Sequence, residues 1–259
     1  MAEQLSVTYI QSDLEWENPQ QNRINFEKKI SALKTQSDII ILPEMFTTGF
    51  AMQPEHLAES MDGATINWML NIAKEQQAAI CGSLIISENN AYYNRFVFVQ
   101  PNGTIQQYNK RHLFTLAGEH MQYNNTTSQV IIEYKNWRIC PLICYDLRFP
   151  VWSRNTQHYD VLIYVANWPT PRVNAWNTLL KARAIENMSY VVGVNRVGTD
   201  PNNNTYSGNS IVLDALGNEL SPISEHLETC VTVKLSKTEL QTVRKKFNFL
   251  NDRDQFTLV

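Results

Sequence analysis

The first ninety residues alternate between short apolar runs and stretches in which apolar residues recur every three or four positions. The run over residues 5–10 predicts a strand, and Asn18-Pro19 predicts the cap and first position of a helix whose apolar positions follow over 24–33. Residues 38–42 are almost wholly apolar, which is typical of a strand covered on both faces. A second helix is predicted around 68–73, before a buried strand over 78–86.

The middle of the chain changes to hairpins. Residues 94–99 and 104–108 have strand composition on either side of the turn Pro101-Asn102-Gly103. Residues 130–134 and 137–143 form a second pair, whose later member runs directly into Cys144. An antiparallel section therefore joins the strand and helix units.

The later half returns to the early alternation. Its predicted strands and helices are strands at 161–165, 190–194, 210–213 and 230–233 and helices at 176–188 and 237–246. No linker, low-complexity tract or repeat interrupts the pattern, so we expect one domain over residues 1–259, with mixed sheets covered by helices. The loops around 115–128 and 198–208, rich in Asn, Thr and Gly, are candidate walls of a site.

Composition excludes several classes of protein. The chain has 259 residues, of which 43% are hydrophobic and 18% charged, enough apolar material for a large core and unlike a disordered or fibrous protein. The formal charge of -3 is scattered along the chain, so no basic stripe is available for nucleic acid or anionic lipid.

The termini and cysteines indicate a compartment. The first residues lack a basic segment followed by an apolar one, and no later run reaches the roughly 20 apolar residues that span a bilayer. We therefore expect a cytoplasmic protein without membrane association. Most of the four cysteines lie in apolar, strand-like runs, which favours reduced thiols available for catalysis: Cys81, Cys140, Cys144 and Cys230.

Cys144 is the first candidate for chemistry. It lies where the buried run 138–143 breaks into the polar sequence Tyr145-Asp-Leu-Arg148. A nucleophile at a sharp strand-to-turn junction projects out of the sheet, and the backbone N–H groups that follow can bind an oxyanion. A core cysteine that happens to end a strand is the alternative interpretation.

Three charged residues are further candidates. Glu44 follows the predicted strand at 38–42, and catalytic groups gather at the carboxyl ends of strands in open sheets. Lys110 follows the strand at 104–108, and its ammonium would stabilise an oxyanion and lower the pKa of a nearby thiol. Glu119 lies in the next loop. Taken singly, each is equally consistent with a solvated surface residue.

Two other chemistries use the same cysteine. Cys140 and Cys144 have the spacing of two zinc ligands, but no second Cys or His pair follows at ligand spacing, so we expect no metal. A cysteine hydrolase with His112 or His120 as its base is the other alternative.

Three motifs, taken together and in order, resemble the nitrilase superfamily of carbon-nitrogen hydrolases over nearly the whole chain. They are Leu42-Pro-Glu44, Lys110-Arg-His-Leu-Phe114 with Gly118-Glu119, and Ile143-Cys-Tyr-Asp-Leu-Arg-Phe-Pro150. The resemblance implies an α/β fold, a four-layer αββα sandwich of two mixed sheets flanked by helices. It also implies a homodimer and chemistry that requires neither metal nor organic cofactor.

The resemblance assigns roles to the candidates. Glu44 would be the general base, Lys110 the oxyanion stabiliser, Cys144 the nucleophile and Glu119 a supporting carboxylate. The backbone N–H of Tyr145 would complete the oxyanion hole. Amide hydrolysis would then pass through a thioester of the cysteine.

The segments 166–176, 183–187 and 195–198 are most similar to the bacterial omega-amidase branch, whose substrates are small 2-oxo dicarboxylate monoamides such as 2-oxoglutaramate. A distal carboxylate then needs a guanidinium, for which Arg172 is the better candidate and Arg148 the second, unless Arg148 braces Cys144 or Glu44. Three aromatic residues are candidate pocket walls: Trp168, Phe114 and Tyr206. Glu186 is interpreted as an ion-pair partner of Arg183.

Two alternatives remain open at the level of sequence. The same triad serves nitriles, N-carbamoyl compounds and other aliphatic amides, and a non-catalytic binding protein of the same fold would keep the same pattern. The expected partner is a small amide, without nucleic acid or membrane.

Overall fold

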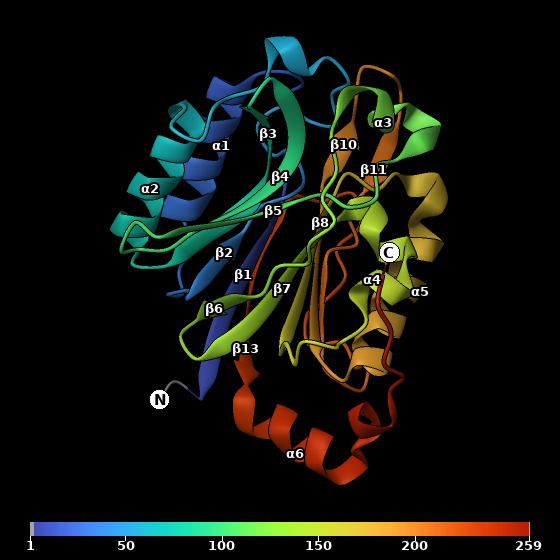
Figure 1. Ribbon diagram of the computed structural model, residues 1–259. Helices are drawn as coiled ribbons and strands as arrows, with labels where there is room; N and C mark the ends of the chain where they lie inside the picture. The colour runs from blue at the N-terminus through green and yellow to red at the C-terminus, as the bar shows by residue number, and fades with distance from the viewer. Residues whose placement is uncertain (1–2, 259) are drawn as a thin grey trace.

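Two β-sheets pack face to face, and helices cover their outer sides (Figure 1). The computed structural model describes residues 3–258. Met1, Ala2 and Val259 lie outside the described residues, and the prediction made from the first residues of the chain falls partly on them. The four-layer αββα arrangement agrees with the fold expected from the sequence.

The first sheet has six strands in the order β13-β1-β2-β3-β4-β5. Their bounds are β13 (Thr229–Ser236), β1 (Gln4–Gln11), β2 (Ile39–Ile41), β3 (Ala79–Glu88), β4 (Ala91–Val99) and β5 (Ile105–Asn109). The strands β1, β2 and β3 are parallel, and the remaining neighbours are antiparallel. Helices α1 (Pro19–Ser31) and α2 (Ala64–Gln76) cover its outer face.

Strand β2 explains why its sequence is apolar at every position. Ile39 and Ile41 belong to the core between the two sheets, whereas Ile40 packs with Phe26 and Ile30 of helix α1 on the other face. Both faces are therefore buried, as the continuous apolar run predicts. The predicted cap of α1 is also observed, because the side chain of Asn18 accepts the N–H of residue 21.

The second sheet has five strands in the order β12-β9-β8-β7-β6. Their bounds are β12 (Ile211–Leu213), β9 (Tyr190–Asn195), β8 (Val161–Ala166), β7 (Trp137–Ile143) and β6 (Ile132–Tyr134). Strands β7, β8 and β9 are parallel, so their carboxyl ends meet at one edge. Helix α5 (Val173–Asn187) packs on the outer face, and α4 (Pro150–Ser153) follows β7 closely in the chain.

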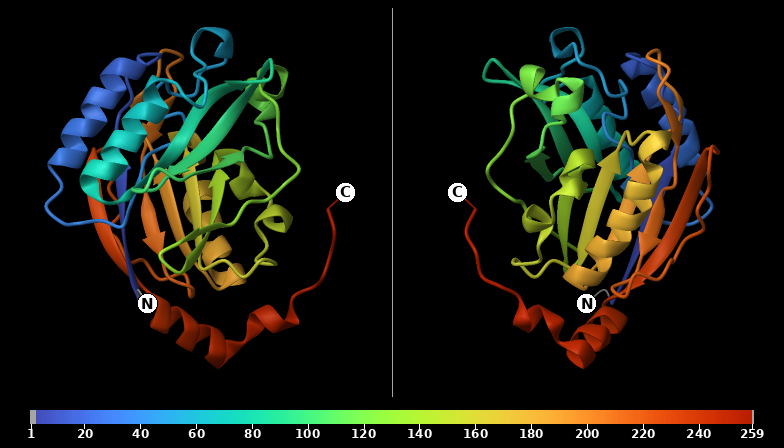
Figure 2. Two further views of the ribbon diagram at one scale, coloured as in Figure 1. Left: turned by 60° about the vertical axis from the view of Figure 1, so that its left-hand side comes forward. Right: turned by 90° about the vertical axis from the view of Figure 1, so that its right-hand side faces the viewer.

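Three features lie outside the two sheets. The segment 198–208, predicted as a loop, contains the hairpin of β10 (Val197–Thr199) and β11 (Thr205–Ser207). Helix α3 (Glu119–Gln122) is a single turn. Helix α6 (Lys237–Phe247) crosses one end of the sandwich, and the last residues continue outside the sheets (Figure 2). Within residues 3–258, no helix is long and apolar enough to cross a bilayer.

Candidate active site

The candidate residues meet where several strands end. Glu44 follows β2, Lys110 follows β5 and Cys144 follows β7. The sandwich brings these ends of its two sheets together, so residues 66 to 100 positions apart in the chain become neighbours. The ammonium Nζ of Lys110 lies 2.9 Å from Glu44 Oε1, and the thiol of Cys144 hydrogen-bonds to the Glu44 carboxylate.

Lys110 is held between two buried carboxylates. Its Nζ lies 2.9 Å from Oε1 of Glu44 and 2.9 Å from each carboxylate oxygen of Glu119, and all three side chains are fully buried. The amide of Asn94 on β4 donates to Oε1 of both carboxylates, at 2.8 and 3.2 Å. The other oxygen of Glu44 accepts the backbone N–H of Asn167, at 2.8 Å. Each charge therefore has hydrogen-bond partners, which a buried ionic group requires.

The cluster carries more negative than positive charge, because two carboxylates share one ammonium. Burial disfavours the charged form of Lys110, but Glu119 and Glu44 outweigh burial and raise the pKa of Lys110 above its usual range. Burial raises the pKa of Glu119, and Glu44 adds to the rise although Lys110 opposes it. Lys110 is thus a permanent ammonium, while Glu119 holds a proton more readily than an exposed glutamate.

Cys144 occupies a strained backbone position. Its φ of 43° lies in the left-handed region, which non-glycine residues rarely adopt. The turn is held by Asp146, whose Oδ2 accepts the N–H of Ile143 at 3.0 Å and whose Oδ1 accepts the N–H of His112 at 2.9 Å. One buried carboxylate therefore connects the end of β7 to the segment that carries Lys110.

The pKa of the Cys144 thiol differs from the sequence expectation. Lys110 was expected to lower it, and its charge does act in that direction. Burial and the charge of Glu44 nevertheless raise the pKa well above the ordinary value, with a smaller contribution from Glu119. The expectation was wrong in its net sign because it included the charge of Lys110 but left out burial, the largest cause, and the charges of the two carboxylates. The resting residue is a thiol that faces a carboxylate able to accept its proton.

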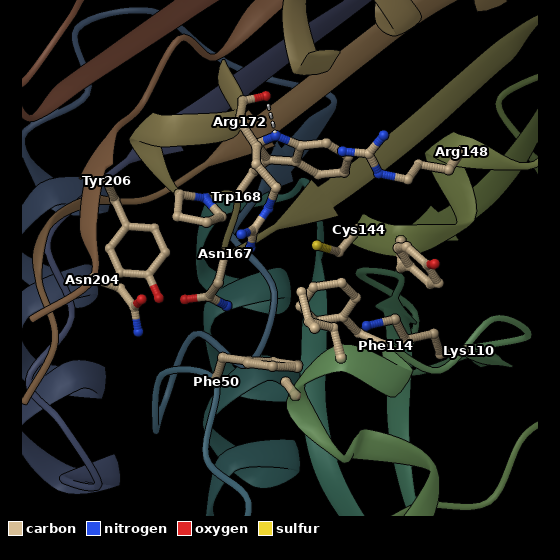
Figure 3. A pocket seen from close by; sticks show the side chains of 14 residues that line it. Phe50, Lys110, Phe114, Cys144, Arg148, Asn167, Trp168, Arg172, Asn204 and Tyr206 are labelled. Atoms are coloured by element: carbon tan, nitrogen blue, oxygen red, sulfur yellow. Dashed lines mark hydrogen bonds between the residues drawn. The ribbon is translucent and has the colours of Figure 1, made fainter. Parts of the chain in front are cut away.

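A pocket of about 230 Å³ opens onto Cys144 and Lys110 (Figure 3). Sites for drug-sized ligands usually measure roughly 300–1,000 Å³, so this pocket suits a small substrate. Most of its other lining residues are aromatic, cationic or amide-bearing: Phe50, Phe114, Tyr145, Arg148, Asn167, Trp168, Arg172, Asn204 and Tyr206. The remaining three are aliphatic: Leu116, Ala117 and Pro169. All five substrate-binding residues expected from the sequence line this pocket: Phe114, Arg148, Trp168, Arg172 and Tyr206.

The two arginines of the pocket lie on aromatic rings. The guanidinium of Arg148 is 4.9 Å from the ring centre of Trp168, and that of Arg172 is 5.3 Å from the ring centre of Phe114. Among the described residues, no carboxylate forms an ion pair with either one. Arg148 is therefore placed to face the pocket, and the alternative that it braces Glu44 finds no such contact.

The other residues considered from the sequence lie elsewhere. His112 directs Nδ1 to Asp146 at 2.8 Å and stacks on Phe149, and His120 is exposed. Neither histidine is among the described residues that line the pocket. Arg183 and Glu186 form the expected ion pair, at 2.9 Å.

Sequence reasoning missed three asparagines. Asn94 bridges Glu44 and Glu119, but it stands next to Arg95 in a strand that becomes apolar only from Phe96, so the sequence gives no signal for it. Asn167 directly follows β8, the kind of strand end at which Glu44 and Cys144 were found. Asn204 lies in a hairpin that was predicted only as a loop.

Comparison with known proteins agrees with this geometry. The family model described as carbon-nitrogen hydrolase matches residues 6–245. The chain is 44% identical to the protein named omega-amidase YafV of Escherichia coli (strain K12) over 254 residues, which cover 98% of each chain. The chain belongs to the carbon-nitrogen hydrolase family. The family predicted from three short motifs is thereby confirmed.

Two further carbon-nitrogen hydrolases are informative. The chain is 31% identical to the 2-oxoglutaramate amidase of Bacillus subtilis (strain 168), with 95% of this chain and 96% of that protein covered. The crystal structure of XC1258 from Xanthomonas campestris, described as a CN-hydrolase superfamily protein with an arsenic adduct in its active site, superposes with a TM-score of 0.96. It is 40% identical in sequence and covers 99% of both chains.

Proposed function

We propose that this protein is an amidase that hydrolyses the terminal amide of small 2-oxo dicarboxylate monoamides, of the 2-oxoglutaramate and succinamate type, to the acid and ammonia. One observation carries the proposal: a small pocket has the Cys144 thiol and the Lys110 ammonium at one end, where Lys110 pairs with the buried Glu44. Elsewhere the pocket is lined by two guanidinium groups that have no carboxylate partner among residues 3–258. An amide with an anionic far end is complementary to both parts. The names of the omega-amidase and 2-oxoglutaramate amidase relatives support the same substrate class.

The first half of the reaction forms a thioester. Glu44 takes the proton of the Cys144 thiol as sulfur attacks the amide carbonyl. Lys110, together with the backbone N–H of Tyr145, stabilises the negative charge that develops on the carbonyl oxygen. Glu44 then returns the proton to the amide nitrogen, the C–N bond breaks, and ammonia leaves.

The second half of the reaction hydrolyses the thioester. Glu44 takes a proton from water, whose oxygen attacks the thioester carbonyl. The carbon–sulfur bond breaks, the sulfur of Cys144 recovers a proton from Glu44, and the acid is released. Glu119 keeps Lys110 in place throughout, because both of its oxygens contact Nζ at 2.9 Å. No step draws on a cofactor.

Recognition of the substrate belongs to the remaining pocket residues. Arg172 would bind the distal carboxylate, since a guanidinium matches a carboxylate with two parallel hydrogen bonds. Arg148 is the second cationic group of the pocket, and Trp168, Phe114 and Tyr206 form its aromatic walls.

We further propose that the enzyme works in the cytoplasm as a homodimer. All four cysteines are unpaired, which suits a reducing compartment. Phe247 and Phe249 stack on each other with 37% and 57% of their surface exposed, whereas Leu250 is buried. Two exposed aromatic rings are a suitable contribution to a subunit contact. Light scattering at micromolar concentration would give twice the mass of the chain if this is correct.

The test of the function is ammonia release from 2-oxoglutaramate, succinamate, glutamine and a simple nitrile, with wild type and Cys144→Ala. Turnover of the first two that depends on Cys144 supports the proposal. Turnover of the nitrile alone would mean that the enzyme belongs to the same family but acts on nitriles and not on these amides. If no substrate releases ammonia and iodoacetamide does not label Cys144, the protein is a binding protein of this fold.

A further inference from the structure

Two turns of this protein have the same five-residue design, Asp-x-x-x-Asn. In the turn 200–204, Oδ1 of Asp200 accepts the N–H groups two and four residues later, at 2.9 and 3.0 Å, and Oδ2 accepts Nδ2 of Asn204 at 2.9 Å. In the turn 214–218, Oδ1 of Asp214 accepts the corresponding N–H groups at 2.8 and 2.9 Å, and Oδ2 accepts Nδ2 of Asn218 at 2.8 Å. The fourth residue of each turn has a positive φ, 62° and 81°.

The two turns differ in their surroundings. The turn 214–218 follows β12, and its aspartate bonds are exposed to solvent. The turn 200–204 joins β10 to β11, and Asp200 is only 6% exposed. Asp200 has one additional partner, the hydroxyl of Tyr206, which donates to Oδ2 at 2.9 Å. Both Asn204 and Tyr206 line the pocket that contains Cys144, on the side shown away from Lys110 in Figure 3.

Tyr206 is also held from its ring face. The guanidinium of the buried Arg196 lies 4.6 Å from the centre of the Tyr206 ring. Arg196 in turn donates to Oδ1 of Asp13 at 2.7 Å, and Gly198 has a φ of 92° where any side chain would run into the Asp13 carboxylate. Tyr206 is therefore restrained at its ring and at its hydroxyl by residues outside the pocket lining.

These contacts decide which atoms the wall presents to a substrate. The hydroxyl proton of Tyr206 points to Asp200, so the oxygen is left with its lone pairs. Nδ2 of Asn204 gives one of its two hydrogens to Asp200, so the amide keeps its second N–H and Oδ1 for the pocket. Burial and the charge of Asp200 raise the pKa of Tyr206, so the phenol keeps its proton over the working pH range.

We propose that Asp200 is a positioning residue for substrate specificity. It holds Asn204 and Tyr206 in place as one wall of the pocket. This wall contacts the part of a linear amide that lies remote from the scissile bond. The proposal rests on the amidase function proposed above and adds the residue that sets this wall. Asp200 acts through its two partners and does not touch the substrate. The turn 214–218 repeats the same bonds without a pocket, so it provides a matched control.

The experiment compares Asp200→Ala with Asp214→Ala on 2-oxoglutaramate and on propionamide, which is too short to reach the wall. Loss of a hydrogen bond to a charged group corresponds to about tenfold in binding. Asp200→Ala is therefore expected to raise KM for 2-oxoglutaramate about tenfold, with kcat and the KM for propionamide within about twofold of wild type. Asp214→Ala is expected to leave both substrates unchanged.

Equal KM increases for both substrates, or no increase for 2-oxoglutaramate, would overturn the proposal. If Asp200→Ala does not fold, Asp200→Asn replaces it in the experiment. Asp200→Asn keeps one acceptor oxygen for the turn but loses the acceptor for the Tyr206 hydroxyl. It is expected to raise KM for 2-oxoglutaramate and to leave KM for propionamide unchanged. In a Tyr206→Phe background that substitution should then have much less effect, because the two residues share one interaction. A full additional effect in that background would also contradict the proposal.

Failure of the proposed function has a different signature. A wild-type enzyme that hydrolyses propionamide but rejects 2-oxoglutaramate would overturn the substrate class. The same variants would then be compared on propionamide and hexanamide, whose far ends differ in reach. A KM increase confined to hexanamide in Asp200→Ala would support the role of Asp200, and equal changes would refute it.

Discussion

The two ends of the pocket are built on opposite principles. At the reactive end, Glu44, Lys110 and Glu119 are fully buried, and each charged group has more than one hydrogen-bond partner. At the recognition end, Arg148 is exposed and Arg172 half-buried, and both lie on aromatic rings without a carboxylate partner among residues 3–258. The charged groups of the reactive end already have partners before a substrate binds, whereas the arginines of the recognition end would gain a carboxylate partner only from the substrate.

This difference predicts how each end responds to substitution. A charge removed from the reactive end leaves its partners buried and unpaired, so stability and rate should fall together. A charge removed from the recognition end leaves nothing unpaired in the free protein, so only the binding of a charged substrate should change.

The largest effect is expected from Lys110→Met. The variant would leave Glu44 and Glu119 buried side by side without a counter-ion, which costs about 3–5 kcal/mol of unfolding free energy. If Lys110 stabilises the oxyanion as proposed, its loss should lower kcat by at least about 100-fold. Thermal unfolding and ammonia release would measure the two effects.

The pH dependence of this variant has a definite sign. Burial already raises the pKa of Glu119, and without Lys110 the pKa rises further. A group whose pKa is raised in the folded state stabilises the protein at low pH and loses that contribution as the pH rises. The stability gap between Lys110→Met and wild type should therefore widen from pH 5 to pH 7. Lys135→Met, which breaks a half-exposed ion pair with Asp38, should change stability by no more than about 1 kcal/mol.

The next effect belongs to Arg172→Ala. If Arg172 binds the distal carboxylate, KM for 2-oxoglutaramate should rise about 10- to 100-fold, and KM for propionamide should stay near wild type. Thermal stability should also stay near wild type, because no partner of Arg172 loses a charge. A similar rise for both amides would contradict carboxylate recognition at this residue. If Arg148→Ala raises KM for 2-oxoglutaramate more than Arg172→Ala does, and leaves KM for propionamide unchanged, Arg148 binds the carboxylate instead.

The same contrast explains what the sequence could and could not predict. Glu44 and Cys144 each follow an apolar run, and Lys110 follows the second strand of a hairpin marked by Pro-Asn-Gly, so all three strand ends are visible in local sequence patterns. The hairpin that carries Asn204 and Tyr206 was predicted only as a loop, because its strands have three residues each and its turn contains consecutive asparagines. The pKa of Cys144 could not be predicted locally, since Glu44 lies 100 positions earlier in the chain.

A smaller effect is expected in the reactivity of the thiol. Glu119 contributes to the raised pKa of Cys144, so Glu119→Gln should bring that pKa closer to its ordinary value. Alkylation of Cys144 by iodoacetamide should then be several-fold faster than in wild type at pH 7, with the rate curve moved to lower pH. Hydrolysis should become slower in the same variant, because Lys110 loses an ionic anchor.

Peptide mass spectrometry after timed alkylation would give the rate at Cys144 separately from the other three cysteines. Glu133→Gln, at an exposed ion pair with Arg138, serves as the control and should leave the rate unchanged. Slower alkylation in Glu119→Gln would mean that its carboxylate promotes the thiolate, contrary to the charge balance of the reactive end.

The smallest effect concerns the backbone at Cys144. Because its φ is 43°, a residue with a Cβ is strained there, and glycine is not. Both Cys144→Ala and Cys144→Gly remove the thiol and should be inactive, but Cys144→Gly should be about 1 kcal/mol more stable. At Cys81, inside strand β3 and absent from the positive-φ residues, the order should reverse, with glycine less stable than alanine. Urea unfolding of the four variants measures both differences. If alanine is more stable than glycine at both cysteines, the turn relaxes once the thiol is gone, and the reactive end does not store strain in its backbone.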